Sequence, residues 1–127
     1  MGRVRERFGP ERVAEEMLAE AYDFVLAGWC QGAAAVDEAG RPVEASSAFA
    51  RKWSVSGALA RVWLRGPMDA DSLEAFQRAN LALAAAVRGV PQDWNDAEER
   101  TLPQVLDALA EAVQRLAEVE ALESSLS

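Results

Sequence analysis

The residues best placed to do chemistry lie in two short segments that each contain a tryptophan. One is the Gly-Trp-Cys-Gln-Gly segment at 28–32, and the other is the Asp-Trp-Asn-Asp segment at 93–96. An exposed tryptophan can act as a platform on which a ligand stacks, and carboxylates and amides can orient a polar group. The candidate contacts to a ligand or a partner are Trp29, Gln31, Asp93, Trp94, Asn95 and Asp96. The favoured interpretation is structural: the rings fix the loops to the core, while Asn and Asp bond to nearby backbone N–H groups.

Several kinds of catalysis are excluded by composition. The chain has no histidine, so a Ser-His-Asp or Cys-His nucleophile, a histidine base and histidine-ligated zinc are all ruled out within one chain. Cys30 is the single cysteine, which excludes an intramolecular disulfide. It would be a nucleophile only if its pKa were lowered, and we expect a free, core-type thiol instead. Glu16 and Glu20 share one helix face, where a solvated surface is the simpler explanation.

The oxygen-rich segment around Trp94 has part of the spacing of a calcium-binding loop. Asp93, Asn95 and Glu99 match positions 1, 3 and 7 of an EF-hand loop. Position 6 would be Glu98 instead of glycine, however, and position 12 would be Gln104 instead of glutamate. The EF-hand is therefore rejected. Because no glycine-rich phosphate loop occurs either, we predict neither a metal nor a cofactor.

The charge of the chain argues against direct contact with nucleic acid. Its 127 residues include 21 acidic and 13 basic side chains, which gives a net charge of -8. An acidic surface repels the phosphate backbone. The acidic residues are scattered, so a mimic of nucleic acid ranks below other hypotheses. No apolar run reaches the length of a membrane span, and the first residues lack the apolar core of a signal peptide, so we expect a cytoplasmic protein.

The length fits a single domain, 1–127, and the abundance of alanine and leucine predicts a mainly α fold. We expect a compact bundle of about four helices, with residues 1–9 and 123–127 frayed. The first helix should begin near Pro10 and end at Gly28, where a positive φ is expected. Residues 29–47 lack a helical period and contain a turn at 37–40. They predict a short irregular or β-hairpin segment.

The remaining helices follow from caps and breaks. The second is expected from about Ser47 to Leu64, capped by Ser46 or Ser47, and Gly57 inside it predicts close approach of another backbone or a large ring. The third follows Asp69 or Asp71 and ends at Gly89. A polar loop, 92–100, then leads to the last helix, which begins with the capping box Thr101-x-x-Gln104. The predicted structural core includes Trp53, Gly57, Leu59, Trp63, Leu109 and Leu116.

The last helix keeps an apolar stripe over about five turns. Most stripes of this kind face the core of their own chain, and the same stripe would also suit a homodimer.

Three segments together resemble a known pattern. They are Gly-Trp-Cys-Gln-Gly at 28–32, Lys-Trp-Ser-Val-Ser-Gly-Ala-Leu at 52–59, and Trp-Asn-Asp at 94–96 followed by Thr101 and the Val105-Leu106 helix. Their order and spacing resemble a family of small bacterial and phage proteins catalogued as a domain of unknown function. The resemblance covers roughly 13–63 and 93–113. It implies a helix ending in a Gly-Trp turn, a short hairpin, a helix with a Trp-Cys-x-x-Gly-Ala-Leu core, an Asn-Asp loop and a final amphipathic helix.

The sequence departs from this pattern at Ser54, where the family has cysteine. If paired cysteines have a role in the family, Cys30 alone cannot serve it. The resemblance therefore implies a fold more than an activity.

Two main hypotheses for function remain. The favoured one is a non-enzymatic interaction or regulatory protein, of bacterial or phage origin, that binds another protein through an acidic or apolar helical face. The alternative is a small-molecule-binding domain or minor enzyme with its site between the Gly28–Gly32 turn and the Trp94–Asp96 loop. An acidic inhibitor that mimics nucleic acid is a second alternative.

Overall fold

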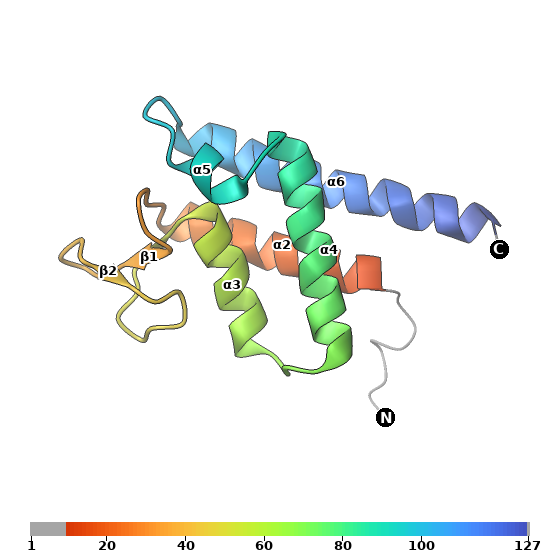
Figure 1. Cartoon of the computed structure of the whole chain (residues 1–127), viewed down its shortest axis with the longest axis horizontal. Helices are drawn as coiled ribbons and strands as arrows, with labels where there is room; N and C mark the ends of the chain where they lie inside the picture. The colour runs from red at the N-terminus through yellow and green to blue at the C-terminus, as the bar shows by residue number, and fades with distance from the viewer. Residues whose placement is uncertain (1–9, 127) are drawn as a thin grey trace.

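The computed structural model describes residues 10–126, which form mainly helices (Figure 1). The elements are α2 (Pro10–Ala27), β1 (Ala35–Val36), β2 (Pro42–Val43), β3 (Lys52–Trp53), α3 (Val55–Arg65), α4 (Ala70–Val87), α5 (Pro91–Asn95) and α6 (Leu102–Leu126). The predicted mainly α fold, with a small β segment after the first helix, is confirmed. Residues 1–9, predicted to be frayed, lie outside the described residues, and residues 123–126, also predicted to be frayed, belong to α6.

The helices pack in two layers that share one core. α2 and α6 lie along each other, and α3 and α4 run side by side across them (Figure 1). Leu18, Leu59, Leu83 and Leu109, one from each long helix, are fully buried between the layers. Burial of each such side chain contributes roughly 1.5–3 kcal/mol, so this set fixes how the layers meet.

The predicted core residues lie in or against this interior. Gly57, Leu59 and Leu109 are buried, as are Trp53 and Leu116. Trp63 is half-buried, and its ring stacks on Phe76 of α4 with centroids 4.5 Å apart.

The segment after α2 forms a three-stranded antiparallel sheet with the order β2-β1-β3. β1 and β2 make the hairpin predicted around residues 37–40, with Ala35 opposite Val43. Gly40 has a φ of 83°, which the turn requires and which glycine adopts without strain. Pro42 lies in an edge strand, where its missing N–H removes no ladder bond.

The second helix begins later than predicted. α3 starts at Val55 instead of near Ser47, and its cap is Ser54, whose Oγ accepts a hydrogen bond from the Gly57 N–H at 3.0 Å. The reason is backbone pairing: Trp53 lies in β3, opposite Ala35. Phe49, which falls within the helix predicted from about Ser47, is instead 71% exposed in the loop before β3. Sheet contacts from a distant segment therefore override the local helical period.

Two glycines are required for reasons of space. Gly28 ends α2 as predicted, but the positive φ expected there is wrong, since Gly32 and Gly40 are the glycines with that conformation. A Cβ at Gly28 would lie 2.6 Å from the Arg51 carbonyl oxygen. A Cβ at Gly57 would overlap the Ala34 carbonyl, which confirms the predicted close approach of another backbone.

The end of α4 and the start of α6 lie close to their predicted positions, whereas α5 was not predicted. The chain leaves α4 through Arg88, which has the left-handed conformation (φ 59°), one residue before the predicted stop at Gly89. Part of the expected polar loop is the short helix α5, which contains Trp94 and Asn95. The capping box of α6 is confirmed, because Thr101 N donates to Gln104 Oε1 at 3.0 Å and Gln104 N donates to Thr101 Oγ1 at 3.4 Å. No helix in residues 10–126 is long and apolar enough to cross a membrane.

Candidate functional site

The two tryptophan segments singled out in the sequence meet at the side chain of Asn95, which is fully buried. Its Oδ1 accepts hydrogen bonds from Trp29 Nε1 at 2.8 Å and from the Val55 N–H at 2.9 Å. Its Nδ2 donates to the Cys30 carbonyl at 3.1 Å and to Asp96 Oδ1 at 2.9 Å. One amide group thus joins the end of the Gly-Trp turn, the start of α3 and the end of α5.

A second set of bonds fastens the same turn to the chain after α5. Gln31 Nε2 donates to the carbonyls of Asn95 at 2.9 Å and Ala97 at 2.8 Å. The Gly32 N–H donates to Asp96 Oδ1 at 2.9 Å. Partial burial raises the pKa of Asp96, but the hydrogen bonds from Gly32, Asn95 and Gln92 outweigh this and hold that pKa below its usual value. Asp96 therefore acts as an ionised acceptor inside the network.

Two residues that were not among the predicted site residues complete the network. Ser54 Oγ donates to Gln92 Oε1 at 2.9 Å, and Gln92 Nε2 donates to Asp96 Oδ1 at 3.0 Å. The spacing of Gln92 and Asp96, four residues apart, could have suggested that they share one face of a helical turn. Ser54 occupies the position where the family resemblance implies cysteine, and here its hydroxyl links α3 to α5.

The side chains of the other two predicted site residues, Trp94 and Asp93, do not take part in this network. The Arg100 guanidinium lies 3.9 Å from the centre of the Trp94 ring, and Arg100 Nε donates to the Trp94 carbonyl at 2.8 Å. A cation stacked on this ring occupies one of its faces. Asp93 is exposed on α5.

Cys30 lies beside the network, and its surroundings do not activate it. Burial raises the pKa of the thiol, the Asp96 carboxylate raises it further, and Lys52 opposes this rise. The thiol points to the Ala33 carbonyl, with the sulfur 3.8 Å from that oxygen. A protonated thiol is a poor nucleophile, so the free, unreactive cysteine expected from the sequence suits this environment.

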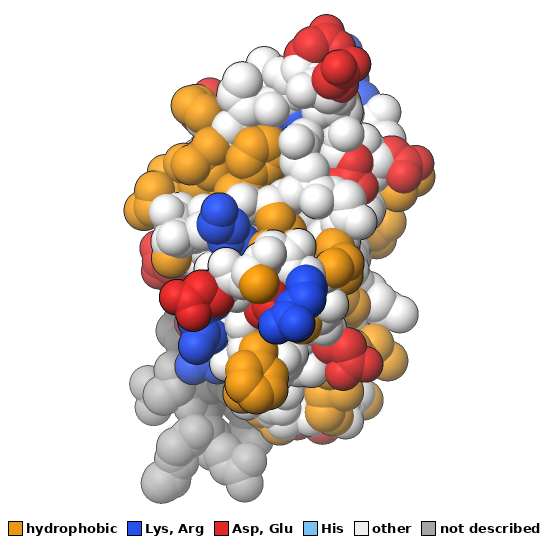
Figure 2. Space-filling model, turned by 90° about the vertical axis from the view of Figure 1, so that its left-hand side faces the viewer, with side chains coloured by type: hydrophobic (Ala, Val, Ile, Leu, Met, Phe, Trp, Pro, Cys, Tyr) orange, Lys and Arg blue, Asp and Glu red, His pale blue; other side chains and the backbone are white. Residues whose placement is uncertain are grey.

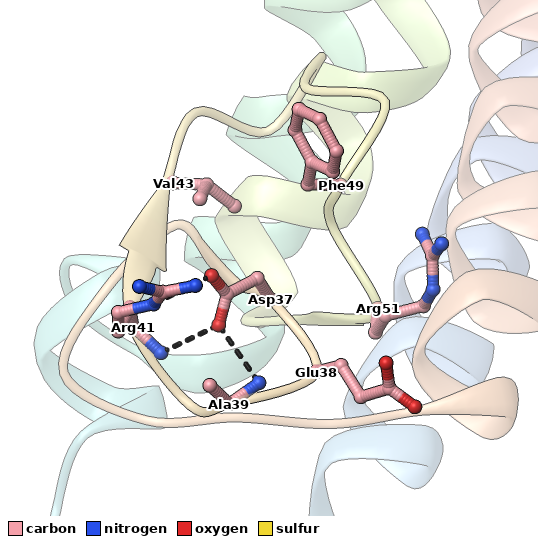
Figure 3. Close-up of a pocket in the computed structure, with 7 residues that line it drawn as sticks. All are labelled: Asp37, Glu38, Ala39, Arg41, Val43, Phe49 and Arg51. Atoms are coloured by element: carbon pink, nitrogen blue, oxygen red, sulfur yellow. Dashed lines mark hydrogen bonds and ion pairs between the residues drawn. The ribbon is translucent and has the colours of Figure 1, made fainter.

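A cavity of about 450 Å³ lies at the hairpin, away from the Asn95 network. Figure 3 shows Val43 and Phe49 on one side, Glu38 and Ala39 on the other, and Arg41 and Arg51 at the two ends. The sequence did not predict this cavity, because it exists only once the 45–50 loop folds next to the hairpin.

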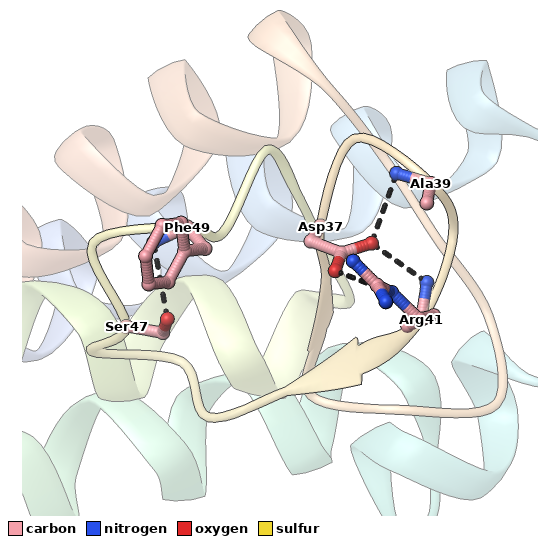
Figure 4. A network of polar contacts seen from close by, with 5 residues as sticks. All are labelled: Asp37, Ala39, Arg41, Ser47 and Phe49. Carbon is pink, nitrogen blue, oxygen red and sulfur yellow. Dashed lines mark hydrogen bonds and ion pairs between the residues drawn. The ribbon is translucent and has the colours of Figure 1, made fainter.

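Asp37 holds the hairpin side of this cavity in shape. Its Oδ1 accepts from the N–H groups of Ala39 and Arg41, both at 2.9 Å, and its Oδ2 pairs with Arg41 Nε at 3.0 Å (Figure 4). The hydrogen bond from the Arg41 N–H is the largest cause of a lowered pKa at Asp37. Across the loop, Ser47 Oγ accepts from the Phe49 N–H at 3.0 Å, which fixes the backbone that presents the exposed ring.

An apolar groove of about 290 Å³ separates α4 from the second half of α6. Its walls are Leu81, Ala82 and Ala85 on α4, with Leu116 and Val119 on α6, and Arg78 and Arg115 stand at its rim. Leu81 is 70% exposed, and Leu122, one turn beyond Val119, is 65% exposed. Each rim arginine pairs with a glutamate four residues earlier, Arg78 with Glu74 and Arg115 with Glu111.

The surface charge is mixed at the hairpin end of the molecule. Figure 2 shows acidic side chains there separated by lysine, arginine and hydrophobic side chains. Among the described residues, no group of three or more Cys, Asp and Glu side chains is arranged to hold a metal ion.

Comparison with known proteins identifies a family. A family of unknown function (DUF6197) matches residues 10–115, from the start of α2 to the middle of α6. The searches of curated proteins and of solved structures gave no match. The matched range includes every residue of the Asn95 network, and the chain belongs to this family.

Proposed function

We propose that this member of the family is a non-enzymatic interaction protein that binds another protein through the apolar helical face formed by α4 and α6. The observation that carries the proposal is the exposure of large aliphatic side chains along one groove. Leu81 on α4 and Val119 on α6, which line it, are 70% and 40% exposed, and Leu122, one turn beyond Val119, is 65% exposed. Apolar side chains that gather around a groove with a polar rim are typical of protein-binding surfaces.

The shape and charge of the groove suit a helix from a partner. Its lining on α4 includes the small side chains of Ala82 and Ala85, which leave room for an inserted apolar side chain. Arg78 and Arg115 at the rim can pair with acidic residues that flank such a side chain. An amphipathic helix that inserts apolar residues one or two turns apart is a common occupant of such grooves.

The Asn95 network supports a binding role over catalysis. The predicted ligand site between the Gly-Trp turn and the Trp94–Asp96 loop is filled by hydrogen bonds among its own residues. The side-chain amides of Asn95 and Gln31 donate to acceptors within the chain. We therefore assign this network the role of holding the loops in place. We also propose that the protein is cytoplasmic and of bacterial or phage origin.

A small-molecule site is the second candidate, at the hairpin cavity instead of at Asn95. Its volume of about 450 Å³ falls within the range of sites for small ligands. The exposed Phe49 ring and the Arg51 guanidinium would contact the ligand. Binding of a small molecule that is lost in Phe49→Ser, but kept in Leu81→Asp, would favour this candidate.

Photo-cross-linking in living source cells tests the groove. A photoreactive residue replaces Leu81 in one variant and Leu26 in a control, because Leu26 is 56% exposed at the opposite end of the molecule, near the end of α2. We expect a discrete protein adduct from position 81 and none from position 26. Leu122→Arg should remove the adduct. Equal adducts from both positions, or none from position 81, would contradict a binding role for this groove.

A further inference from the structure

We infer that the hairpin cavity binds a free α-amino acid with a large apolar side chain. The inference rests on the second candidate function, since it names the class of small molecule that the same cavity takes, and it is independent of the α4–α6 groove. Three observations carry it: walls that are fixed by hydrogen bonds, two charged groups of opposite sign without an ion-pair partner, and an apolar wall beside them.

The loop before β3, which contributes Phe49 to the cavity, is held by two guanidinium groups. Arg61 Nη1 donates to the carbonyls of Ala45 at 3.0 Å and Ser47 at 2.8 Å. Arg51 Nη1 donates to two further carbonyls of this loop, at 3.1 and 2.9 Å. The Phe49 ring, 71% exposed, is thus presented by an ordered backbone. A site whose walls are fixed beforehand loses little conformational freedom when a ligand binds.

The charged groups that line the cavity sum to zero, but only two of them neutralise each other. Asp37 and Arg41 form an ion pair at 3.0 Å. Glu38 and the Arg51 guanidinium are the other two charged groups of the lining, and neither has an ion-pair partner within residues 10–126. A cation would meet Arg51 there and an anion would meet Glu38 as a like charge, whereas a zwitterion can pair with both.

The free donors and acceptors match the two charged groups of an amino acid. Because Nη1 of Arg51 holds the loop, its Nε and Nη2 remain as donors, and these two can bind both oxygens of a carboxylate. The Glu38 carboxylate can accept from the ammonium group, and Figure 3 shows both side chains on the right of the cavity. The end of a peptide carries only one of these charges and would leave the other group unpaired, which favours a free amino acid.

Val43 and Phe49 provide the apolar contact for the ligand. Figure 3 shows them across the cavity from Glu38. A large side chain on the ligand would cover them, and an aromatic one can stack on the Phe49 ring. The volume of about 450 Å³ lies in the lower part of the range for small-molecule sites, which suits a metabolite of this size.

Titration of the isotope-labelled full chain with L-phenylalanine, followed by NMR, tests the inference. We expect saturable shifts of the amide signals in the hairpin and the loop before β3, with a dissociation constant of about 1 mM or below. Hydrocinnamate lacks the ammonium group and phenethylamine lacks the carboxylate, so each should bind about tenfold more weakly or worse. L-Leucine should also bind, whereas glycine, which has no side chain to cover Phe49, should not.

Two substitutions separate the role of the charge from that of the ring. Glu38→Gln neutralises an exposed side chain, so it should weaken the binding of L-phenylalanine about tenfold and should not weaken that of hydrocinnamate. Phe49→Ser should weaken the binding of both. Glu44→Gln is the matched control and should bind as the wild type does, because Glu44 is exposed in the same segment and lies outside the cavity lining.

The outcomes separate this inference from both proposed functions. No saturable shift with L-phenylalanine or L-leucine up to about 10 mM overturns the inference, and so does equally tight binding of hydrocinnamate or phenethylamine. If that binding is lost in Phe49→Ser, the small-molecule site stands with another class of ligand. Binding that Phe49→Ser leaves unchanged overturns the cavity as the site as well. The groove is tested separately, by cross-linking from position 81.

Discussion

Replacing Asn95 by alanine should destabilise the protein more than any other single change in the loops around it. Asn95 is fully buried and makes four hydrogen bonds with its side chain, to Trp29, Val55, Cys30 and Asp96. Alanine removes the acceptor for two N–H groups, the Trp29 indole and the Val55 backbone. The Val55 N–H belongs to a fully buried residue at the start of α3.

The magnitude follows from these two donors. A buried donor left without an acceptor costs about 1–3 kcal/mol, which applies in full to the Val55 N–H. Trp29 is half-buried, and its N–H can partly bind water, so we expect a total loss of roughly 2–4 kcal/mol in the free energy of unfolding. The Cys30 carbonyl and the Asp96 carboxylate also lose a donor, but Asp96 is exposed and can bind water instead. The free energy of unfolding of a domain of this size is about 5–15 kcal/mol, so the variant should be only marginally stable.

Urea denaturation followed by circular dichroism measures the effect. Asp93→Ala is the matched control, because Asp93 is exposed on the same short helix, and it should change stability by less than about 0.5 kcal/mol. Trp29→Phe removes one donor while keeping a ring and should cost about 1 kcal/mol. In Asn95→Ala the Trp29 N–H is already unpaired, so adding Trp29→Phe should cost less than it does alone. A loss below about 1 kcal/mol for Asn95→Ala, or strict additivity of the pair, would refute the assignment of the network to stability.

Three further changes test separate parts of the structure. Gly57→Ala should cost at least about 2 kcal/mol by calorimetry despite the better helix propensity of alanine, because its Cβ would overlap Ala34, whereas Gly89→Ala has open space and should be nearly neutral. Thr101→Ala should cost about 0.5–2 kcal/mol in urea melts, since it removes one half of the capping box. Asp96→Asn should reduce the acid sensitivity of folding. The folded pKa of Asp96 lies below its unfolded value, so its contribution is complete above about pH 5 and is lost as the pH falls through about 4 and below; equal acid titrations of variant and wild type would contradict this.

Helix ends that depend on neighbouring residues were predictable from the sequence. The capping box at Thr101, the start of α2 at Pro10 and the Asp69 cap of α4 each involve groups within one helical turn. The start of α3 was predicted wrongly because Trp53 has a helical spacing to Trp63 but pairs with β1, some twenty residues earlier in the chain. The local periodicity of a sequence contains no information on a backbone partner so far away in the chain.

The candidate site was likewise predicted only in part. The sequence selected Trp29, Asn95 and Asp96, and the structure brings all three into one network. It did not select Gln92 or Ser54, whose roles depend on the angle at which α5 meets α3. The hairpin cavity and the α4–α6 groove could not be predicted from the sequence either, because each is formed by segments whose side chains meet only in the folded chain.

The four tryptophans explain why the binding surface should lie away from the motifs that mark the family. Trp29 donates to Asn95, Trp53 donates to the Ala45 carbonyl, Trp63 stacks on Phe76, and Trp94 carries the Arg100 guanidinium. Each ring is thus engaged by a contact that fixes one segment of the fold. Large aliphatic side chains remain exposed elsewhere on the surface, and two of them, Leu81 and Val119, line the α4–α6 groove. A chain that commits its four tryptophan rings to the fold and leaves an apolar groove open between α4 and α6 has the means to bind a helix of another protein there.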